Sequence, residues 1–187
     1  ISSEPTLFRT SDGVLFGVEI CEDVWAPTPP SNHLALAGAE IIFNLSASDE
    51  LTGKHNYLMS LLQQQSARTI TGYVYASAGF GESTQDVVYG GNAIICENGS
   101  VIAKGQRFAM SEQLVTAQID IEKLRGDRRS NTTFTNAQRR MATEKINIID
   151  MHSACQRDFV LEREIDPTPF IPKSGEMKEK CDEILNI

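Results

Sequence analysis

The chain has 187 residues, of which 41% are hydrophobic and 22% are charged, so it is large enough to form one globular domain with a sizeable core. Its formal net charge of -8 and pI near 4.9 would repel nucleic acids and anionic membranes, and we expect neither as a partner. No apolar run approaches the ~20 residues that span a bilayer, and the N-terminus lacks the pattern of a signal peptide, which predicts a cytoplasmic location.

The first half of the chain alternates strand and helix patterns. Apolar residues and turn signals predict a hairpin at its start, with Thr6 to Phe8 as one strand, residues 11–13 as the turn and residues 14–20 as the second strand. Ser31 can cap a short helix that ends near Gly38, and a strand follows over residues 40–45. Apolar residues at helical spacing predict a helix over residues 54–71, stopped by Gly72 before a strand over residues 73–76. The pattern is that of an α/β domain.

The second half is less regular. Residues 79–91 read as a long loop, and the Asn98-Gly99 step joins a hairpin formed by residues 92–96 and 100–103. Residues 114–121 alternate as a further strand, whereas residues 122–143 are polar and are expected to be helical at the start or weakly ordered. A short apolar run over residues 145–149 follows. A proline-rich connector then precedes a last amphipathic helix, capped by Ser174, with an apolar face that needs a partner.

The cysteines and histidines give no sign of a metal site. Cys21, Cys96, Cys155 and Cys181 are widely spaced and form no CxxC pair, so neither a zinc knuckle nor a dithiol motif is indicated. The three histidines, His33, His55 and His152, show no ligand spacing. We therefore expect reduced thiols and no metal.

One cysteine stands out by its position. In the run from Val18 to Trp25, an apolar strand ends on Cys21, and the proline-rich segment that follows cannot continue the strand. A sharp turn at a strand end aims the side chain and the next backbone N–H groups at one point, as acyl transfer by a nucleophilic thiol requires. The alternative is a small buried hydrophobic residue, because free cysteines are among the most buried residues.

Three motifs carry a family resemblance. The chain contains Cys-Glu-Asp-Val-Trp-Ala-Pro-Thr-Pro-Pro from Cys21, Asn-Leu-Ser-Ala-Ser from Asn44, and Gly-Gly-Asn-Ala-Ile from Gly90 ahead of Asn98-Gly99. Together they resemble the nitrilase, or carbon–nitrogen hydrolase, superfamily, and more narrowly the glutaminase domains of glutamine-dependent NAD synthetases. The resemblance implies an α-β-β-α sandwich, of which residues 1–162 would be the later part. Residues 163–187 resemble the connector and first helix leading toward a synthetase domain.

The resemblance also implies a chemistry. Members of the family use a Glu-Lys-Cys triad to hydrolyse an amide through a thioester, and Cys21 matches the nucleophile. The backbone N–H of Glu22 matches the oxyanion donor, and its side chain matches a group that binds the α-amino end of glutamine. Ser48 and Lys54 resemble the residues that hold the amino-acid end. The open alternatives are a turn residue for Ser48 and a solvated lysine at a helix start for Lys54, while Trp25 is expected to pack against the elbow.

Two members of the triad have no matching position. In the family the triad Glu and Lys precede the cysteine by about half a domain, and only twenty residues precede Cys21. We therefore expect the N-terminal part of the domain to be missing and the 187-residue chain alone to have little amidase activity.

The implied role is to hydrolyse glutamine and supply ammonia for ATP-dependent synthesis of NAD from nicotinic acid adenine dinucleotide. ATP would bind the synthetase domain of the same polypeptide, not this chain, and a homo-oligomer is expected by resemblance. Two alternatives remain: a free-standing nitrilase-type amidase acting on another small amide, and a non-catalytic assembly module.

Overall fold

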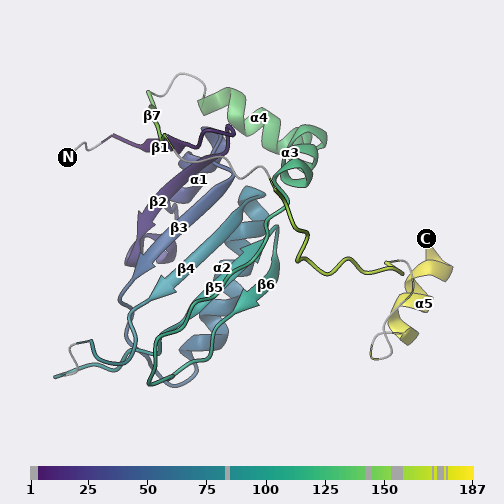
Figure 1. Ribbon diagram of the computed structural model, residues 1–187. Helices are drawn as coiled ribbons and strands as arrows, with labels where there is room; N and C mark the ends of the chain where they lie inside the picture. The colour runs from purple at the N-terminus through teal and green to yellow at the C-terminus, as the bar shows by residue number, and fades with distance from the viewer. Residues whose placement is uncertain are drawn as a thin grey trace.

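The computed structural model describes residues 4–82, 85–141, 145–152, 158–169, 171, 175 and 177–187, and its centre is one mixed β-sheet (Figure 1). The strands lie in the order β6-β5-β4-β3-β2-β1-β7. Their bounds are β1 Thr6–Arg9, β2 Leu15–Ile20, β3 Ile41–Ser46, β4 Gly72–Ser77, β5 Ala93–Glu97, β6 Ser100–Lys104 and β7 Asn147–Asp150. The helices are the 3-10 turn η1 Cys21–Trp25, α1 Pro30–Leu36, α2 Lys54–Thr69, α3 Ile121–Ser130, α4 Thr132–Met141 and α5 Met177–Asn186.

The sheet topology brings three strand ends to one edge. Strands β2, β3 and β4 are parallel, and α1 and α2 make the two crossovers between them. Antiparallel hairpins extend the sheet on both sides, β1 with β2 and β5 with β6, and β7 pairs parallel to β1. Because the carboxyl ends of parallel strands meet at the same edge, the residues that follow β2, β3 and β4 lie close together.

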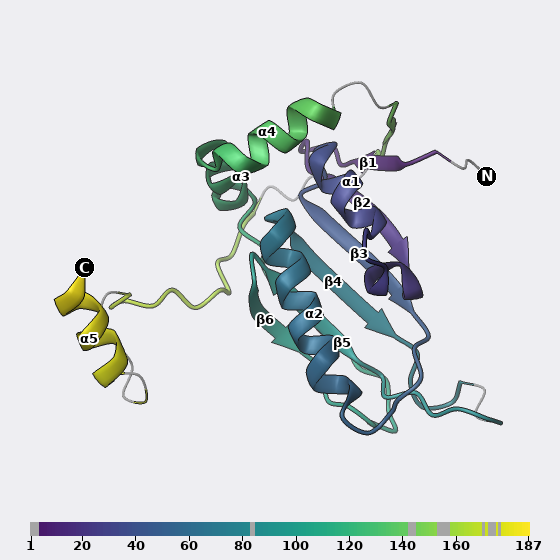
Figure 2. The same ribbon diagram turned by 180° about the vertical axis from the view of Figure 1, so that it is seen from behind.

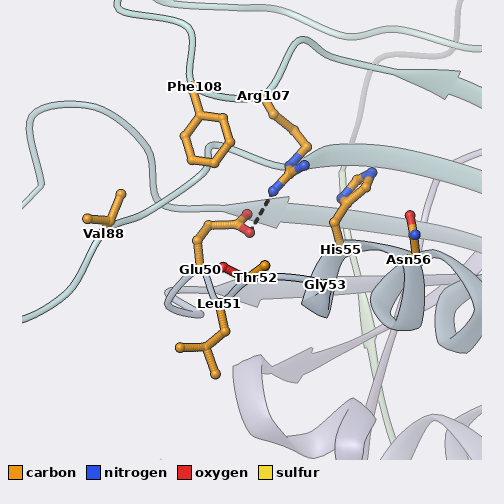
Figure 3. Close-up of a pocket in the computed structure, with 9 residues that line it drawn as sticks. All are labelled: Glu50, Leu51, Thr52, Gly53, His55, Asn56, Val88, Arg107 and Phe108. Carbon is orange, nitrogen blue, oxygen red and sulfur yellow. Dashed lines mark hydrogen bonds and ion pairs between the residues drawn. The ribbon is translucent and has the colours of Figure 1, made fainter.

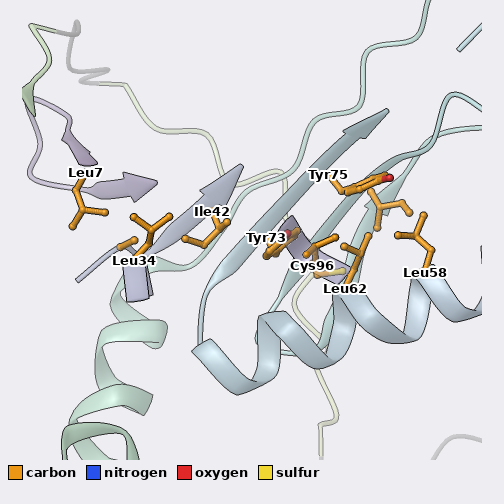
Figure 4. Close-up of a cluster of buried hydrophobic side chains, with 11 residues drawn as sticks. Leu7, Leu34, Ile42, Leu58, Leu62, Tyr73, Tyr75 and Cys96 are labelled. Atoms are coloured by element: carbon orange, nitrogen blue, oxygen red, sulfur yellow. The ribbon is translucent and has the colours of Figure 1, made fainter. Parts of the chain in front are cut away.

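One face of the sheet carries the core. Helices α1 and α2 cover this face, as the view from behind shows (Figure 2). Alternate residues of the strands point toward these helices and meet a row of apolar helix residues, and burial of each such side chain contributes ~2 kcal/mol. The side chains of this cluster that Figure 4 labels are Leu7, Leu34, Ile42, Leu58, Leu62, Tyr73, Tyr75 and Cys96.

The opposite face of the sheet is also apolar, but among the described residues no helix lies on it (Figure 1). Phe16 stacks on Phe8 with 5.2 Å between ring centroids and meets Phe43 edge-on at 5.4 Å. Toward the carboxyl ends of the strands, Ile20 and Leu45 are 54% and 55% exposed. The described sheet therefore forms a two-layer α-β unit with one uncovered apolar face.

A buried arginine attaches α3 to the end of α2. The guanidinium of Arg128 donates hydrogen bonds to the carbonyls of Ala39, Thr69 and Ile70 at 2.6, 3.1 and 3.0 Å, and it lies 4.9 Å from the ring of Phe134. Burial lowers the pKa of Arg128 to about 10. The last carbonyls of a helix lack intrahelical partners, so this side chain satisfies groups that would otherwise be buried without one.

Two predicted elements differ from the structure. Residues 114–120 form no strand, because Asp120 accepts a hydrogen bond from the Lys123 N–H at 2.9 Å and so starts a helix at Ile121. The alternation reflects packing, since Ile119 contacts Gly72 while Leu114 is 89% exposed.

The polar region that follows is more helical than expected. It forms the two helices α3 and α4, separated at Asn131, whose side chain accepts a hydrogen bond from the Phe134 N–H. The first predicted helix also begins two residues early, at Pro30, since proline suits the first helical position, and Ser31 therefore lies inside α1 and is not its cap. The remaining strands and helices lie within a few residues of their predicted positions.

The C-terminal segment leaves the sheet at a buried ion pair. Arg163 donates two hydrogen bonds to the carboxylate of Glu97, at 2.7 and 2.8 Å, and the Glu97 side chain is only 3% exposed. Residues 164–167 beyond this point form neither helix nor strand, and α5 lies apart from the sheet with all its residues exposed (Figures 1 and 2). The proposed cap Ser174 lies outside the described residues. None of the helices that the structure describes has the length and apolarity needed to cross a membrane.

Candidate active site at the end of β2

Cys21 lies at a sharp turn directly after β2. Its φ of 47° is in the left-handed region that a side chain disfavours, and the 3-10 turn η1 begins at this residue. Asp23 holds the turn, because its carboxylate accepts a hydrogen bond from the Ile20 N–H at 2.7 Å and its carbonyl accepts one from the Ala26 N–H at 3.1 Å. The sequence analysis assigned no role to Asp23, although an acid two residues after a strand-end cysteine is a signal for such a turn.

The two thiols of the sheet occupy different environments. Cys96 in β5 is fully buried, and burial raises the pKa of its thiol to about 11. Cys21 is only half-buried and forms no disulfide. The description of a buried, inert cysteine therefore fits Cys96 and not Cys21, and a partly exposed thiol is what a nucleophile needs.

Polar groups from β3 and β4 surround the Cys21 thiol. The hydroxyl of Ser46 donates to the Cys21 Sγ at 3.5 Å and accepts a hydrogen bond from the Tyr75 hydroxyl at 2.8 Å. The Asn44 amide donates to the Cys21 carbonyl at 3.4 Å. Burial raises the pKa of Tyr75. Sequence reasoning quoted Asn44 and Ser46 only as parts of a motif and missed Tyr75 entirely.

Ser48 and Lys54 lie in contact. Lys54 is the first residue of α2, and its Nζ donates to the Ser48 hydroxyl at 2.8 Å and to the Asp49 carbonyl at 2.7 Å. The same ammonium pairs with the Asp49 carboxylate at 3.0 Å and lowers the pKa of that carboxyl. With a side chain only 21% exposed, Lys54 is not the freely solvated lysine of the alternative interpretation.

Aromatic rings join this pair to the elbow. Lys54 Nζ lies 5.4 Å from the ring of Trp25, which packs at 5.5 Å between centroids on Tyr57 of α2 and also against the core. Glu22 is exposed on η1 beside the thiol. The binding roles of Glu22, Ser48 and Lys54 stay predictions.

A second polar cluster fixes the loop that carries Ser48 and Asp49 (Figure 3). Glu50 pairs with Arg107 at 2.8 Å and accepts a hydrogen bond from the Asn92 amide at 2.5 Å, while its N–H donates to the Val88 carbonyl. These residues adjoin a pocket of about 510 Å³ lined by Glu50, Leu51, Thr52, Gly53, His55, Asn56, Val88, Arg107 and Phe108. Cys21 is not among them. The sequence pattern gave no signal for this contact between residues 57 positions apart.

The clustering of metal-ligating side chains bears on the kind of site that the described residues can form. Across the part of the chain that the structure describes, no three histidine, cysteine or acidic side chains gather as a metal site would require. The chemistry available at the elbow is that of a thiol with neighbouring hydroxyl donors.

Comparison with known proteins gives consistent findings. Residues 2–129 match the carbon–nitrogen hydrolase family. Over 97% of its length the chain is 39% identical to the glutamine-dependent NAD(+) synthetase of Mycobacterium tuberculosis, and over 77% it is 30% identical to that of Homo sapiens. A carbon–nitrogen hydrolase from Helicobacter pylori G27 superposes with a TM-score of 0.60 at 20% identity, over 73% of this chain and 50% of that one. The chain spans 28% of the mycobacterial synthetase and 20% of the human one.

Proposed function

Because this chain belongs to the carbon–nitrogen hydrolase family, we propose that it is part of a glutaminase domain in which Cys21 is the nucleophile. The observation that carries the proposal is the elbow itself: a half-buried free thiol on a left-handed residue at the end of a parallel strand, with a hydroxyl donor 3.5 Å from its sulfur. The similarity to glutamine-dependent NAD synthetases supports glutamine as the amide.

The proposed reaction has two stages. The Cys21 thiolate attacks the side-chain carboxamide carbon of glutamine and forms a C–S bond, and the carbonyl oxygen becomes an oxyanion that the Glu22 N–H stabilises. The tetrahedral intermediate collapses with cleavage of the C–N bond, and the nitrogen takes a proton and leaves as ammonia. Water then attacks the thioester, which releases glutamate and returns the sulfur as a thiol.

The amino-acid end of glutamine would lie between the elbow and the start of α2. The exposed carboxylate of Glu22 is suited to the α-ammonium group. Ser48 and Lys54 are suited to the α-carboxylate, because a hydroxyl and an ammonium already meet there at 2.8 Å. Asp49 competes for the same ammonium, so binding of the α-carboxylate requires Lys54 to exchange or share that partner.

The domain arrangement follows from the same proposal. Residues 1–162 would be the later part of the glutaminase domain, and residues 163–187 would lead toward a synthetase domain in the same polypeptide, which binds ATP and uses the ammonia to make NAD. The triad Glu and Lys would come from chain outside these 187 residues. The isolated chain would then have little activity, and assembly into a homo-oligomer is part of the proposal.

The test compares nitrogen donors in the longer polypeptide. We expect Cys21→Ala to abolish NAD formation from glutamine while leaving NAD formation from ammonium unchanged. Cys181→Ala is the matched control, since this exposed thiol on α5 lies outside the site. Survival of glutamine-dependent synthesis in Cys21→Ala would reject the assignment and favour a different amidase or an inert module.

A further inference from the structure

Two hydroxyl groups connect the buried interior of the sheet to the Cys21 sulfur. Tyr75 is 1% exposed, and its hydroxyl lies 2.8 Å from the Ser46 Oγ, which lies 3.5 Å from the Cys21 Sγ. Ser46 is the last residue of β3, and Tyr75 lies in the neighbouring parallel strand β4 opposite Asn44, so the backbone fixes their positions. The thiol therefore faces a preformed chain of hydroxyls and not bulk water on this side.

The direction of these hydrogen bonds follows from the chemistry of the groups. The Tyr75 hydroxyl donates to the Ser46 Oγ at 2.8 Å, and because burial raises the pKa of Tyr75 above its ordinary value of 10.0, the phenol has this proton to donate at neutral pH. A serine hydroxyl has one proton and two acceptor lone pairs. Since Ser46 accepts from Tyr75, its own proton is free to point at the sulfur.

We infer that Ser46 stabilises the Cys21 thiolate by donating a hydrogen bond to it, and that Tyr75 is a positioning residue that orients the Ser46 hydroxyl. The inference deepens the proposed glutaminase role of Cys21 and rests on it for its catalytic meaning. A thiolate is the reactive form, and a free thiol is mostly protonated at neutral pH, so a donor that favours the anion increases the reactive fraction. Hydrogen bonds to charged groups are about twice as strong as neutral ones.

Other titratable groups lie on the elements packed around the elbow, and the test must hold them constant. These groups belong to η1 itself and to the elements that lie next to it. They are Glu19, Glu22, Asp23, His33, Lys54, His55, Tyr57 and Tyr75. Substitution of Ser46 changes none of these charges. Tyr75→Phe removes a hydroxyl that is neutral at the pH of the assay.

The experiment measures alkylation of Cys21 by iodoacetamide in the longest polypeptide that contains this chain, with the modified peptide quantified by mass spectrometry at a series of pH values. Alkylation forms an S–C bond and releases iodide, and it needs the thiolate but not glutamine hydrolysis. We expect Ser46→Ala to slow alkylation about tenfold at pH 7 and to move the midpoint of the pH–rate profile upward by about one unit. For Tyr75→Phe we expect a smaller effect in the same direction, about threefold.

Three controls separate this role from misfolding. Ser46→Thr keeps the hydroxyl and should stay within about twofold of the wild-type rate. Ser60→Ala removes a hydroxyl on the exposed side of α2, which bonds only the Asn56 carbonyl, and should change nothing. Cys181 in the same samples is exposed and should react equally in all variants.

Two results would overturn the inference. One is an unchanged midpoint in Ser46→Ala, even with a lower rate, which would make Ser46 a packing residue. The other is an unchanged profile in Tyr75→Phe, which would remove Tyr75 from the chain of donors. The measurement is alkylation, which does not depend on glutamine hydrolysis. Stabilisation of the thiolate by Ser46 and Tyr75 is therefore tested separately, even if the comparison of nitrogen donors rejects Cys21 as a glutaminase nucleophile.

Discussion

The thiols of Cys96 and Cys21 differ in their surroundings because one cysteine lies within a strand and the other lies just past a strand end. Cys96 points into the helix-covered core, and burial raises the pKa of its thiol to about 11. Cys21 lies past a strand end, half-buried and next to a hydroxyl donor. Position at a strand end, and not residue type, separates the partly exposed thiol of Cys21 from the buried thiol of Cys96.

The raised pKa of Cys96 predicts a pH dependence of stability. Since the folded-state pKa of about 11 lies above the ordinary value of 9, the thiol favours the folded state below pH 9, and this contribution is lost as the pH rises toward 11. We expect the destabilisation caused by Cys96→Ala to shrink by ~2 kcal/mol between pH 8 and pH 11. Urea unfolding at both pH values measures it, with Cys181→Ala as the control. A pH-independent difference between Cys96→Ala and wild type would contradict the prediction.

Lys54 yields a prediction for substrate binding. In the longer polypeptide, Lys54→Met should lower kcat/KM for glutamine by about 10- to 100-fold, mainly through KM, because a charged hydrogen bond to the α-carboxylate is lost. The measurement is NAD formation with glutamine varied, and the ammonium-dependent rate is the control that should stay unchanged. A fall in kcat with an unaltered KM would show that Lys54 does not bind this carboxylate.

At the residue scale, the local sequence pattern pointed to Cys21, whereas Ser48 and Lys54 were expected only through the family resemblance. Cys21 follows a strand and precedes prolines, and Ser48 and Lys54 are six residues apart in one loop and helix start, where the structure places them in contact. The contact between Ser46 and Tyr75 was not predicted, because it depends on the pairing of β3 with β4, which no local pattern specifies. The role of Asp23 in the turn was not predicted, because its hydrogen-bond partner is a backbone N–H.

At the scale of elements, the candidate site depends on a loop that long-range contacts hold. The segment after β3 carries Ser48 and Asp49, and Glu50 fastens it to Asn92 and Arg107. Its own backbone supplies one further bond, from the Glu50 N–H to the Val88 carbonyl. The loop is therefore held by the Glu50 side chain, by the hydrogen bonds of Lys54 to Ser48 and Asp49, and by the bridge between Asp49 and Tyr89.

Removal of the Glu50 side chain should make the loop that carries Ser48 and Asp49 less rigid. Glu50 is 9% exposed in its side chain, and Glu50→Ala leaves the Arg107 guanidinium without its carboxylate and the Asn92 amide without its acceptor. We expect a loss of ~2 kcal/mol in the free energy of unfolding and faster amide exchange over residues 47–53. Glu122→Ala is the matched control, because this acid also pairs with an arginine but is 75% exposed, and it should cost less than ~0.5 kcal/mol. Equal effects of the two substitutions would contradict the account.

The elements themselves were predictable where local signals agreed with pairing. The Asn98-Gly99 turn joins β5 and β6 as expected, with both residues at positive φ, and the alternation of β2 and β3 gave the correct order of strand and helix. The strand predicted over residues 114–121 was wrong. Alternation of apolar and polar residues indicates a segment that lies on a surface, but it does not show that a neighbouring strand is hydrogen-bonded to it. The predicted strand lies in the chain as an extended segment that ends at the Asp120 cap.

At the scale of the whole molecule, the sheet has one face covered by helices and one apolar face that the described residues leave open. Phe8, Phe16 and Phe43 form its centre, and Leu45 extends it to the edge near Cys21. Apolar patches of this kind promote association with another surface. The fold class was predictable through the family resemblance, because composition and periodicity indicate only an α/β domain.

The open face predicts the behaviour of the isolated chain. We expect the 187-residue chain to self-associate at micromolar concentration, and Leu45→Lys to reduce this association, because a charge placed on the apolar face resists burial. Sedimentation velocity measures both. Leu114→Lys is the control, since this leucine is 89% exposed outside the sheet and its substitution should leave the association unchanged. A monomeric, cooperatively unfolding wild-type chain would contradict the prediction.

Covalent labelling tests whether Cys21 is the nucleophile of a glutaminase. The longer polypeptide is incubated with a glutamine analogue that carries a diazoketone in place of the amide, and the modified cysteine is located by peptide mass spectrometry. The account predicts a label on Cys21, lost in the presence of excess glutamine, and none on Cys96 or Cys181. A label absent from Cys21, or one that glutamine does not suppress, would contradict it.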